Sequence, residues 1–197
     1  DEFIDFLNNG HSLYAIKIDK EYYNDLYNVL KKENSLIKYY VLVKFLMRKE
    51  QFSDVFNNVI EFEDCGLKYL IMAYIYIYTT ENIVKAKECL VQAIEYKDDF
   101  AMYYLGYLFL IEKNYEEAYK YFKMGCEYGN PRCFLEIGNL YYNGFYLETN
   151  KSKALEYFLY ASQYNYDIAC YNVGVTYEYY YNNYDDALKY YMLAADL

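Results

Sequence analysis

The sequence has very few of the residues that catalytic and nucleic-acid sites usually require. It contains one histidine, His11, and two arginines, Arg48 and Arg132, in 197 residues with a net charge of −10. A lone histidine is a weak basis for acid–base chemistry, and two arginines form no basic stripe for phosphate backbones. The composition therefore argues against nucleic-acid binding and gives no catalytic residue.

Metal-binding and membrane-spanning patterns are missing as well. The five cysteines form no CxxC pair and no cluster with histidine, so the sequence predicts neither a metal site nor a cofactor. We expect reduced, buried thiols in a cytoplasmic protein, but Cys126 and Cys133 bracket a turn where a disulfide is geometrically conceivable. No uncharged apolar run reaches 18 residues, and the stretch 69–78 suits a buried helix better than a membrane span.

What the sequence does contain is a repeat. Four alanines recur at spacings of 32, 36 and 33 residues: Ala86, Ala118, Ala154 and Ala187. A large apolar residue follows each alanine after four positions and a small residue follows after seven, which places all three on one helical face. Eleven positions after the alanines come residues that we expect to end this helix in a left-handed conformation: Lys97, Gly129 and Asn165.

A second helix precedes each of the last three alanines. It carries a small residue and, five positions later, one of three glycines: Gly106, Gly138 and Gly174. Small residues at a crossing let two helices approach closely, and a single helix pair cannot bury both of its faces. The pattern therefore predicts an all-α fold, a right-handed superhelical solenoid of stacked antiparallel helix pairs.

The loop before Ala154 carries the most specific motif. It reads Y-x-x-G-x-Y-L-x-x-N-x-x-K-A, where Gly144 permits a tight turn, Leu147 can fill space between helices, and Asn150 can cap the next helix. This motif resembles that of the Sel1-like repeat family, which is related to tetratricopeptide repeats and has G-x-G-V-x-x-D-x-x-K-A. Tyr146 stands where the family has its second glycine.

The resemblance covers roughly residues 64–197, and the residue pattern of the whole chain predicts three regions. Residues 67–197 form about four Sel1-like or tetratricopeptide-like repeats, residues 35–66 form a degenerate helical repeat, and residues 1–34 form a partly helical segment of unassigned fold. The last helix reaches Leu197 without a glycine cap, which is typical of an array that continues.

The resemblance also implies a binding surface on the first helix of each pair, at offsets −3, +1, +4 and +5 from the glycine. Carried over to this sequence, these offsets give twelve positions that are mostly aromatic and apolar, three of which are Ile111, Asn143 and Glu178. The other nine are the predicted partner-facing residues: Tyr103, Tyr107, Leu110, Leu135, Asn139, Tyr142, Tyr171, Val175 and Tyr179. We expect a non-catalytic protein–protein interaction scaffold that binds an apolar or amphipathic helical segment of another protein. No membrane insertion is expected.

The repeats allow two alternative functions. In the first, the repeats self-associate and the chain is a structural or assembly protein. Cysteine-rich relatives have been associated with penicillin binding or β-lactamase activity, and Ser35 and Lys38 spell S-x-x-K, but no S-D-N or K-T-G motif follows. We interpret the paired carboxylates at the predicted starts of helices as helix caps and not as an acid–base pair: Glu116, Glu117, Asp185 and Asp186.

Overall fold

The computed structural model describes residues 52–80 and 82–197 of the chain. Every regular element in this part is a helix, as the all-α prediction requires. In chain order these are α4 (Phe52–Val59), α5 (Gly66–Ile75), the π-helix η4 (Tyr76–Thr80), α6 (Ile83–Glu95), α7 (Asp99–Ile111), α8 (Tyr115–Glu127), α9 (Pro131–Asn143), α10 (Lys151–Ser162), α11 (Asp167–Tyr179) and α12 (Tyr184–Asp196). The predictions for residues 1–34, and those made on His11, Ser35, Lys38 and Arg48, lie outside the described residues.

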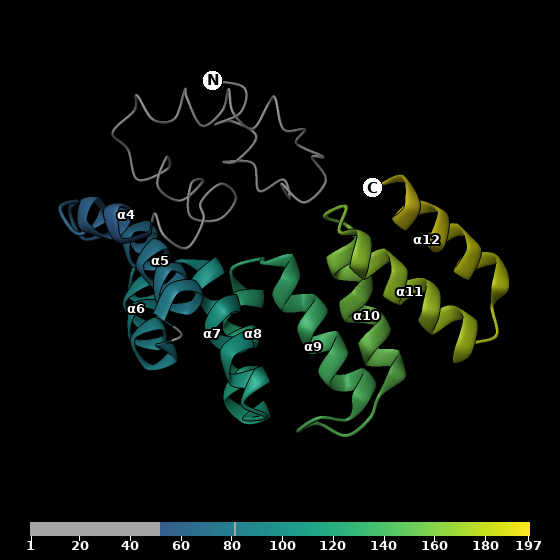
Figure 1. Cartoon of the computed structure of the whole chain (residues 1–197). Coiled ribbons are helices and arrows are strands. Elements are labelled where there is room, and N and C mark those ends of the chain that lie inside the picture. The colour runs from purple at the N-terminus through teal and green to yellow at the C-terminus, as the bar shows by residue number, and fades with distance from the viewer. Residues whose placement is uncertain (1–51, 81) are drawn as a thin grey trace.

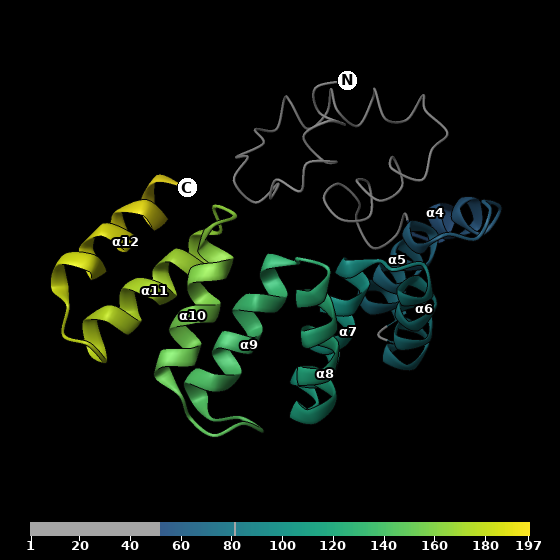
Figure 2. The ribbon, with the colours of Figure 1, turned by 180° about the vertical axis from the view of Figure 1, so that it is seen from behind.

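Successive helices pair as the repeat predicts. The first helices of the pairs, here called A helices, are α5, α7, α9 and α11, and each packs against the B helix that follows it: α6, α8, α10 or α12. Each B helix up to α10 also contacts the next A helix. Figures 1 and 2 show the pairs following one another along a curved array from α4 to α12. The buried apolar residues form three clusters along this array, which is the arrangement of a solenoid.

Glycine sets the distance between the two helices of a pair. A Cβ atom added at Gly138 of α9 would lie 2.5 Å from Cε1 of Phe158 and 3.3 Å from the carbonyl oxygen of Ala154, both on α10. Two further pairs, α7/α8 and α11/α12, show the same relation: Gly106 with Phe122, and Gly174 with Tyr191. In these three pairs the large residue four positions after the alanine therefore fills the space that the glycine leaves, and the predicted small-residue crossing is confirmed there.

A second set of small residues joins one pair to the next. Ala161 of α10 and Ala169 of α11 are both fully buried at such a junction, and Gly125 of α8 faces the buried Cys133 of α9. All five cysteines are free thiols, so Cys126 and Cys133 are not bonded to each other. Close packing of small side chains, and not a covalent link, connects these repeats.

The turns take the conformations that their residues predict. Gly144 ends α9 with φ 73°, Asn150 accepts a hydrogen bond from the backbone N of Lys153 (2.9 Å), and Leu147 packs against the third cluster. Tyr146, in place of the family's second glycine, adopts a left-handed backbone with φ 64°. The three residues predicted to end B helices also have positive φ: Lys97, Gly129 and Asn165.

Asparagine caps every B helix. The side-chain oxygens of Asn82, Asn114, Asn150 and Asn183 each accept a hydrogen bond from the backbone N–H three residues later. The carboxylate pairs that were predicted to cap α8 and α12 lie instead in the first turn of each helix, where they still face the positive helix end.

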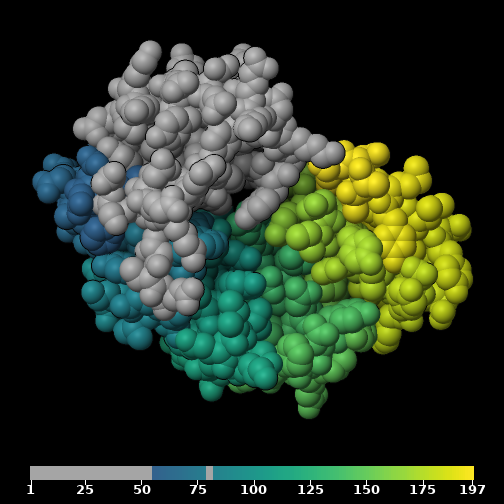
Figure 3. All heavy atoms as spheres, viewed as in Figure 1, coloured from purple at the N-terminus to yellow at the C-terminus, as the bar shows by residue number. Residues whose placement is uncertain are grey.

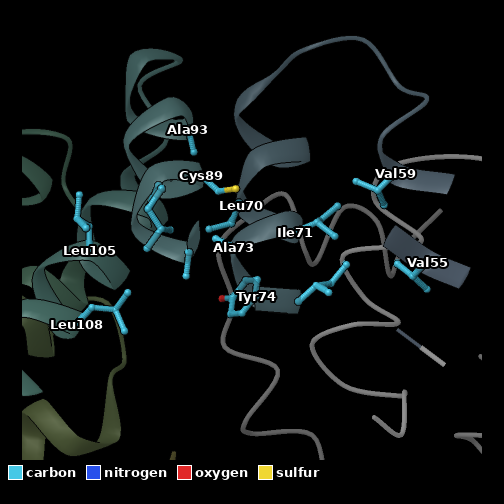
Figure 4. Packing of buried hydrophobic residues seen from close by; sticks show 14 residues of the cluster. Val55, Val59, Leu70, Ile71, Ala73, Tyr74, Cys89, Ala93, Leu105 and Leu108 are labelled. Carbon is cyan, nitrogen blue, oxygen red and sulfur yellow. The ribbon is translucent and has the colours of Figure 1, made fainter. Parts of the chain in front are cut away.

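The first cluster connects α4 to the pairs that follow. Val55 and Val59 of α4 are buried with Leu70 and Ile71 of α5, as Figure 4 shows. The degenerate repeat over residues 35–66 stays a prediction because, of its two expected helices, only the second part, with α4, lies within the described residues. Helix α4 ends at Val59, and Gly66 is the first residue of α5.

Candidate partner-binding surface

Side chains of the successive A helices α7 and α9 contact each other. Tyr103 and Tyr107 lie one turn apart on α7, and their rings are stacked with centroids 6.0 Å apart. The guanidinium carbon of Arg132, on α9, lies 5.6 Å from the centroid of the Tyr103 ring, and an Arg132 N–H donates to the Tyr104 hydroxyl (3.3 Å). One predicted partner-facing residue, Tyr103, thus contacts the next repeat through an arginine that the prediction did not include.

A chain of polar side chains continues from α9 to α11. The amide of Asn139 donates to Oε2 of Glu136 (3.2 Å), and the amide of Asn172, on α11, donates to Oδ1 of Asn139 (3.3 Å). We call the set formed by Tyr103, Tyr107, Glu136, Asn139 and Asn172 the A-helix surface. It extends over three successive A helices, and Arg132 links its α7 part to α9 through the Tyr103 ring.

Glu136 is the carboxyl group of this surface. Burial raises its pKa, and the hydrogen bond from Asn139 only partly opposes that effect. Within residues 52–80 and 82–197, no lysine or arginine forms an ion pair with it. Helices α7, α9 and α11 carry one cationic side chain, Arg132, and four carboxylates: Asp99, Glu136, Asp167 and Glu178. The A helices therefore present an acidic, aromatic surface.

The nine predicted partner-facing residues differ in exposure. Tyr107 and Tyr179 are exposed (40% and 72%), and Asn139 and Val175 are half-buried. Leu110 and Tyr142 are also half-buried: Leu110 packs against the third cluster, and Lys151 holds its ammonium group 3.2 Å from the centroid of the Tyr142 ring.

The other three predicted residues share the offset −3 from the glycine: Tyr103, Leu135 and Tyr171. This position faces the following repeat. Leu135 is 4% exposed because α10 and α11 pack against it, and its side chain adds nothing to the surface. Tyr171 is 55% exposed and lies beside Tyr191 at the end of the array. The neighbouring offset, −2, holds Glu136 and Asn172, which sequence reasoning missed and which do reach the A-helix surface.

The described residues offer binding contacts and few reactive groups. Burial raises the pKa of Cys89 to about 11 and that of Cys126 to about 12, which disfavours their thiolates. Within the described ranges, no three histidine, cysteine or acidic side chains are placed to hold a metal ion. None of the helices described is long and apolar enough to cross a membrane.

Comparison with known families identifies the repeat. The family model of the Sel1 repeat matches residues 99–130, 135–163 and 167–197, which correspond to the pairs α7/α8, α9/α10 and α11/α12. The protein carries three Sel1 repeats. A comparison with curated protein sequences finds no match for the chain.

Solved structures share the arrangement of these Sel1 repeats. A Sel1 repeat protein from Oxalobacter formigenes superposes with a TM-score of 0.68 at 18% identity, over 90% of this chain and 84% of that one. The protective antigen c5321 of uropathogenic Escherichia coli, which has an SLR fold, gives 0.62 at 16% identity over 89% of this chain and 41% of its own. The Cut9–Hcn1 hetero-tetramer of the APC/C gives 0.61 at 14% identity over 88% and 37%.

At these identities the similarity shows the fold, a helical-repeat solenoid of the Sel1 and tetratricopeptide-like kind. Repeats of this kind are commonly protein–protein interaction scaffolds and generally lack catalytic activity.

Proposed function

We propose that this protein is a non-catalytic scaffold whose A-helix surface holds a segment of a partner protein. The observation that carries the proposal is the run of contacts along this surface: Tyr103 and Tyr107 stack on α7, Arg132 of α9 lies over the Tyr103 ring, and Asn172 of α11 donates to Asn139 of α9. These side chains are already held by their neighbours, so they lose little rotamer freedom when a ligand binds. A segment lying across them contacts three repeats at once.

The chemistry of the surface favours an apolar or amphipathic segment that also carries a basic residue. Tyr107 offers a large, partly exposed ring, and tyrosine is among the residues that anchor protein interfaces most often. A lysine or arginine of the partner would pair with Glu136 and remove the cost of its buried charge. An acidic segment would be repelled by a chain of net charge −10.

Site-specific photo-crosslinking tests this proposal. A photoreactive phenylalanine analogue is placed at position 107 or 139 of the full chain, and at position 160 as a control, because Tyr160 is an exposed tyrosine of B helix α10. We expect one partner protein to be crosslinked from positions 107 and 139 and not from 160. Tyr107→Ala should then weaken binding of that partner about tenfold while the chain stays folded.

Two results would contradict the proposal. The first is crosslinking that is equal from all three positions. The second is a chain that self-associates in sedimentation and retains no other protein, which would support the alternative of an assembly protein. The cytoplasmic location that we predicted from the thiols stays a prediction, which cell fractionation of the native source tests.

A further inference from the structure

The loop between α9 and α10 carries an exposed tyrosine in a strained conformation. Tyr146 is 53% exposed and has φ 64°, at the position where the Sel1 motif has a glycine. A residue with a side chain loses about 1–2 kcal/mol in this left-handed region, whereas glycine adopts it without strain. Strained residues of this kind cluster at binding and active sites. The ring of Tyr146, and not its backbone, is therefore the feature that requires a function.

Aromatic contacts hold this loop against α8 of the preceding repeat. The ring of Phe145 stacks on that of Tyr115 with centroids 4.8 Å apart, and the centroid of the Tyr146 ring lies 5.7 Å from that of Tyr119. Leu147 packs against the third cluster. The loop is therefore positioned before a ligand arrives, so binding to it costs little conformational entropy.

A hollow lies between Tyr146 and α8. Its volume is about 400 Å³, at the lower end of the range of about 300–1,000 Å³ for small-ligand sites. It therefore suits a long side chain better than a whole helix. Its apolar wall consists of Tyr119, Met124 and Tyr146, and we call it the α8 hollow. Figure 3 shows α8, in teal, beside the green atoms of the next repeat along the lower edge of the molecule.

The charged wall of the α8 hollow attracts a cation. Lys120 of this wall is neutralised by Glu117, which lies 3.1 Å away. In the part of the chain that the structure describes, the other three charged residues of the wall form no ion pair: Glu116, Lys123 and Glu127. Two carboxylates and one ammonium group leave a net charge of −1 at the wall, within a chain of net charge −10. A positively charged ligand is therefore favoured over an acidic one.

The aromatic wall favours arginine over lysine. The face of an aromatic ring attracts a cation, and a guanidinium group also stacks on the ring because it is planar and weakly hydrated. The chain uses this contact elsewhere, since the guanidinium carbon of Arg132 lies 5.8 Å from the ring centroid of Phe100 and 5.6 Å from that of Tyr103. A stacked guanidinium group still has N–H donors at its edge for a bidentate pair with a carboxylate.

We propose that the α8 hollow binds an arginine side chain of a partner protein. The guanidinium plane lies against the Tyr146 ring, and its N–H groups pair with Glu116 or Glu127. A second copy of the chain is a poorer occupant, because it brings its own net charge of −10 and because its Arg132 is already held against rings of α7. The hollow lies on a B helix, so it is separate from the A-helix surface and does not depend on the function proposed there.

Titration with an arginine peptide tests the proposal. The probe is acetyl-Gly-Leu-Arg-Leu-Gly-amide, added to the isotope-labelled full chain and followed by the NMR shifts of the backbone amides of Tyr146 and Glu127. We expect saturable shifts in the millimolar range. A probe with citrulline, which has nearly the shape of arginine but no charge, should bind at least about fivefold more weakly, as the loss of a cation–π contact requires.

Tyr146→Gly removes the ring and should weaken binding of the arginine probe by a similar factor. Glycine keeps the left-handed backbone of the loop and relieves its strain, so the chain should stay folded in a thermal melt.

Matched variants separate the α8 hollow from other exposed side chains. Glu116→Gln combined with Glu127→Gln should weaken binding of the probe, whereas Glu156→Gln, at an exposed glutamate of α10, should not. Tyr160→Ala, at an exposed tyrosine of α10, should also leave it unchanged. Tyr107→Ala should have no effect on the probe either, because Tyr107 belongs to the A-helix surface, so the two proposed sites can fail separately.

Three results of the titration would overturn the proposal. They are the absence of saturable shifts, equal binding of the citrulline probe, and equal binding of the arginine probe by the Tyr146→Gly chain. Sedimentation of the chain alone gives a further one. If the wild-type chain dimerises and the Tyr146→Gly chain does not, a second copy occupies the α8 hollow in place of a partner protein.

Discussion

Gly138→Ala places one methyl group where α9 crosses α10, and we expect it to destabilise the fold although alanine is the better helix former. The new Cβ would lie 2.5 Å and 2.6 Å from Cε1 and Cδ1 of Phe158. The ring must therefore retreat by about 1 Å to reach a normal carbon–carbon separation of about 3.5 Å. Phe158 is 2% exposed and has little room to move. Moving the helices apart would relieve the contact but would open the crossing.

The size of the effect follows from two opposing terms. Overpacking a filled core costs about 1–3 kcal/mol, and this site should lie in the upper part of that range because the Ala154 carbonyl oxygen, 3.3 Å from the new Cβ, belongs to the backbone. Replacing glycine by alanine in a helix returns about 1 kcal/mol. We therefore expect a net loss of about 1–2 kcal/mol in the free energy of unfolding, measured by urea denaturation with circular dichroism.

A double-mutant cycle identifies the cause of that loss. Phe158→Leu removes the ring and is destabilising by itself, but it also makes room for the new methyl group. Adding Gly138→Ala to Phe158→Leu should then cost at least about 1 kcal/mol less than adding it to the wild-type chain. A Gly138→Ala chain as stable as the wild type, or additive effects in the cycle, would refute the packing argument.

Three further predictions follow from individual residues. Because Tyr146 has φ 64°, Tyr146→Gly should be about 1 kcal/mol more stable than Tyr146→Ala in urea unfolding, and equal stability would contradict backbone strain there. Burial raises the pKa of Cys126 from 9.0 to about 12, so at pH 8 iodoacetamide should modify it roughly a thousandfold more slowly than an ordinary thiol until the chain unfolds. Burial also raises the pKa of Glu136, so the folded state binds protons more tightly than the unfolded state. Glu136→Gln should therefore raise the melting temperature at pH 7, and this gain should vanish as the pH falls below about 4.3.

The crossings were predictable from the sequence because they depend on local spacing. A glycine on one helix and an alanine followed by a large apolar residue on the next leave few other ways to pack. The structure accordingly places Gly138 against Phe158. Asn150 was predictable for the same reason, since capping involves only the next three residues.

The partner-facing register was harder to predict because a helix turns by about 100° per residue. The residue three positions before Gly138 is Leu135, which points into the next repeat. The residue two positions before Gly138 is Glu136, which reaches the surface. Exposure at −3 also depends on whether another helix follows. Leu135 is covered and Tyr171 is not, although the two residues hold the same position in their repeats. Local spacing carries no information about that difference.

The contacts that join the repeats also form part of the surface proposed to bind a partner. Asn130, 2% exposed, caps the start of α9 and donates to the Asp99 carboxylate of α7 (2.7 Å), and Asn172 of α11 donates to Asn139 of α9. In a stacked array such nearest-neighbour contacts supply much of the stability. A segment lying across the A-helix surface would bridge the same junctions and would bind the stacked state better than the separated one. Binding and stacking are therefore linked, and the segment should protect the junctions from opening in proportion to its occupancy.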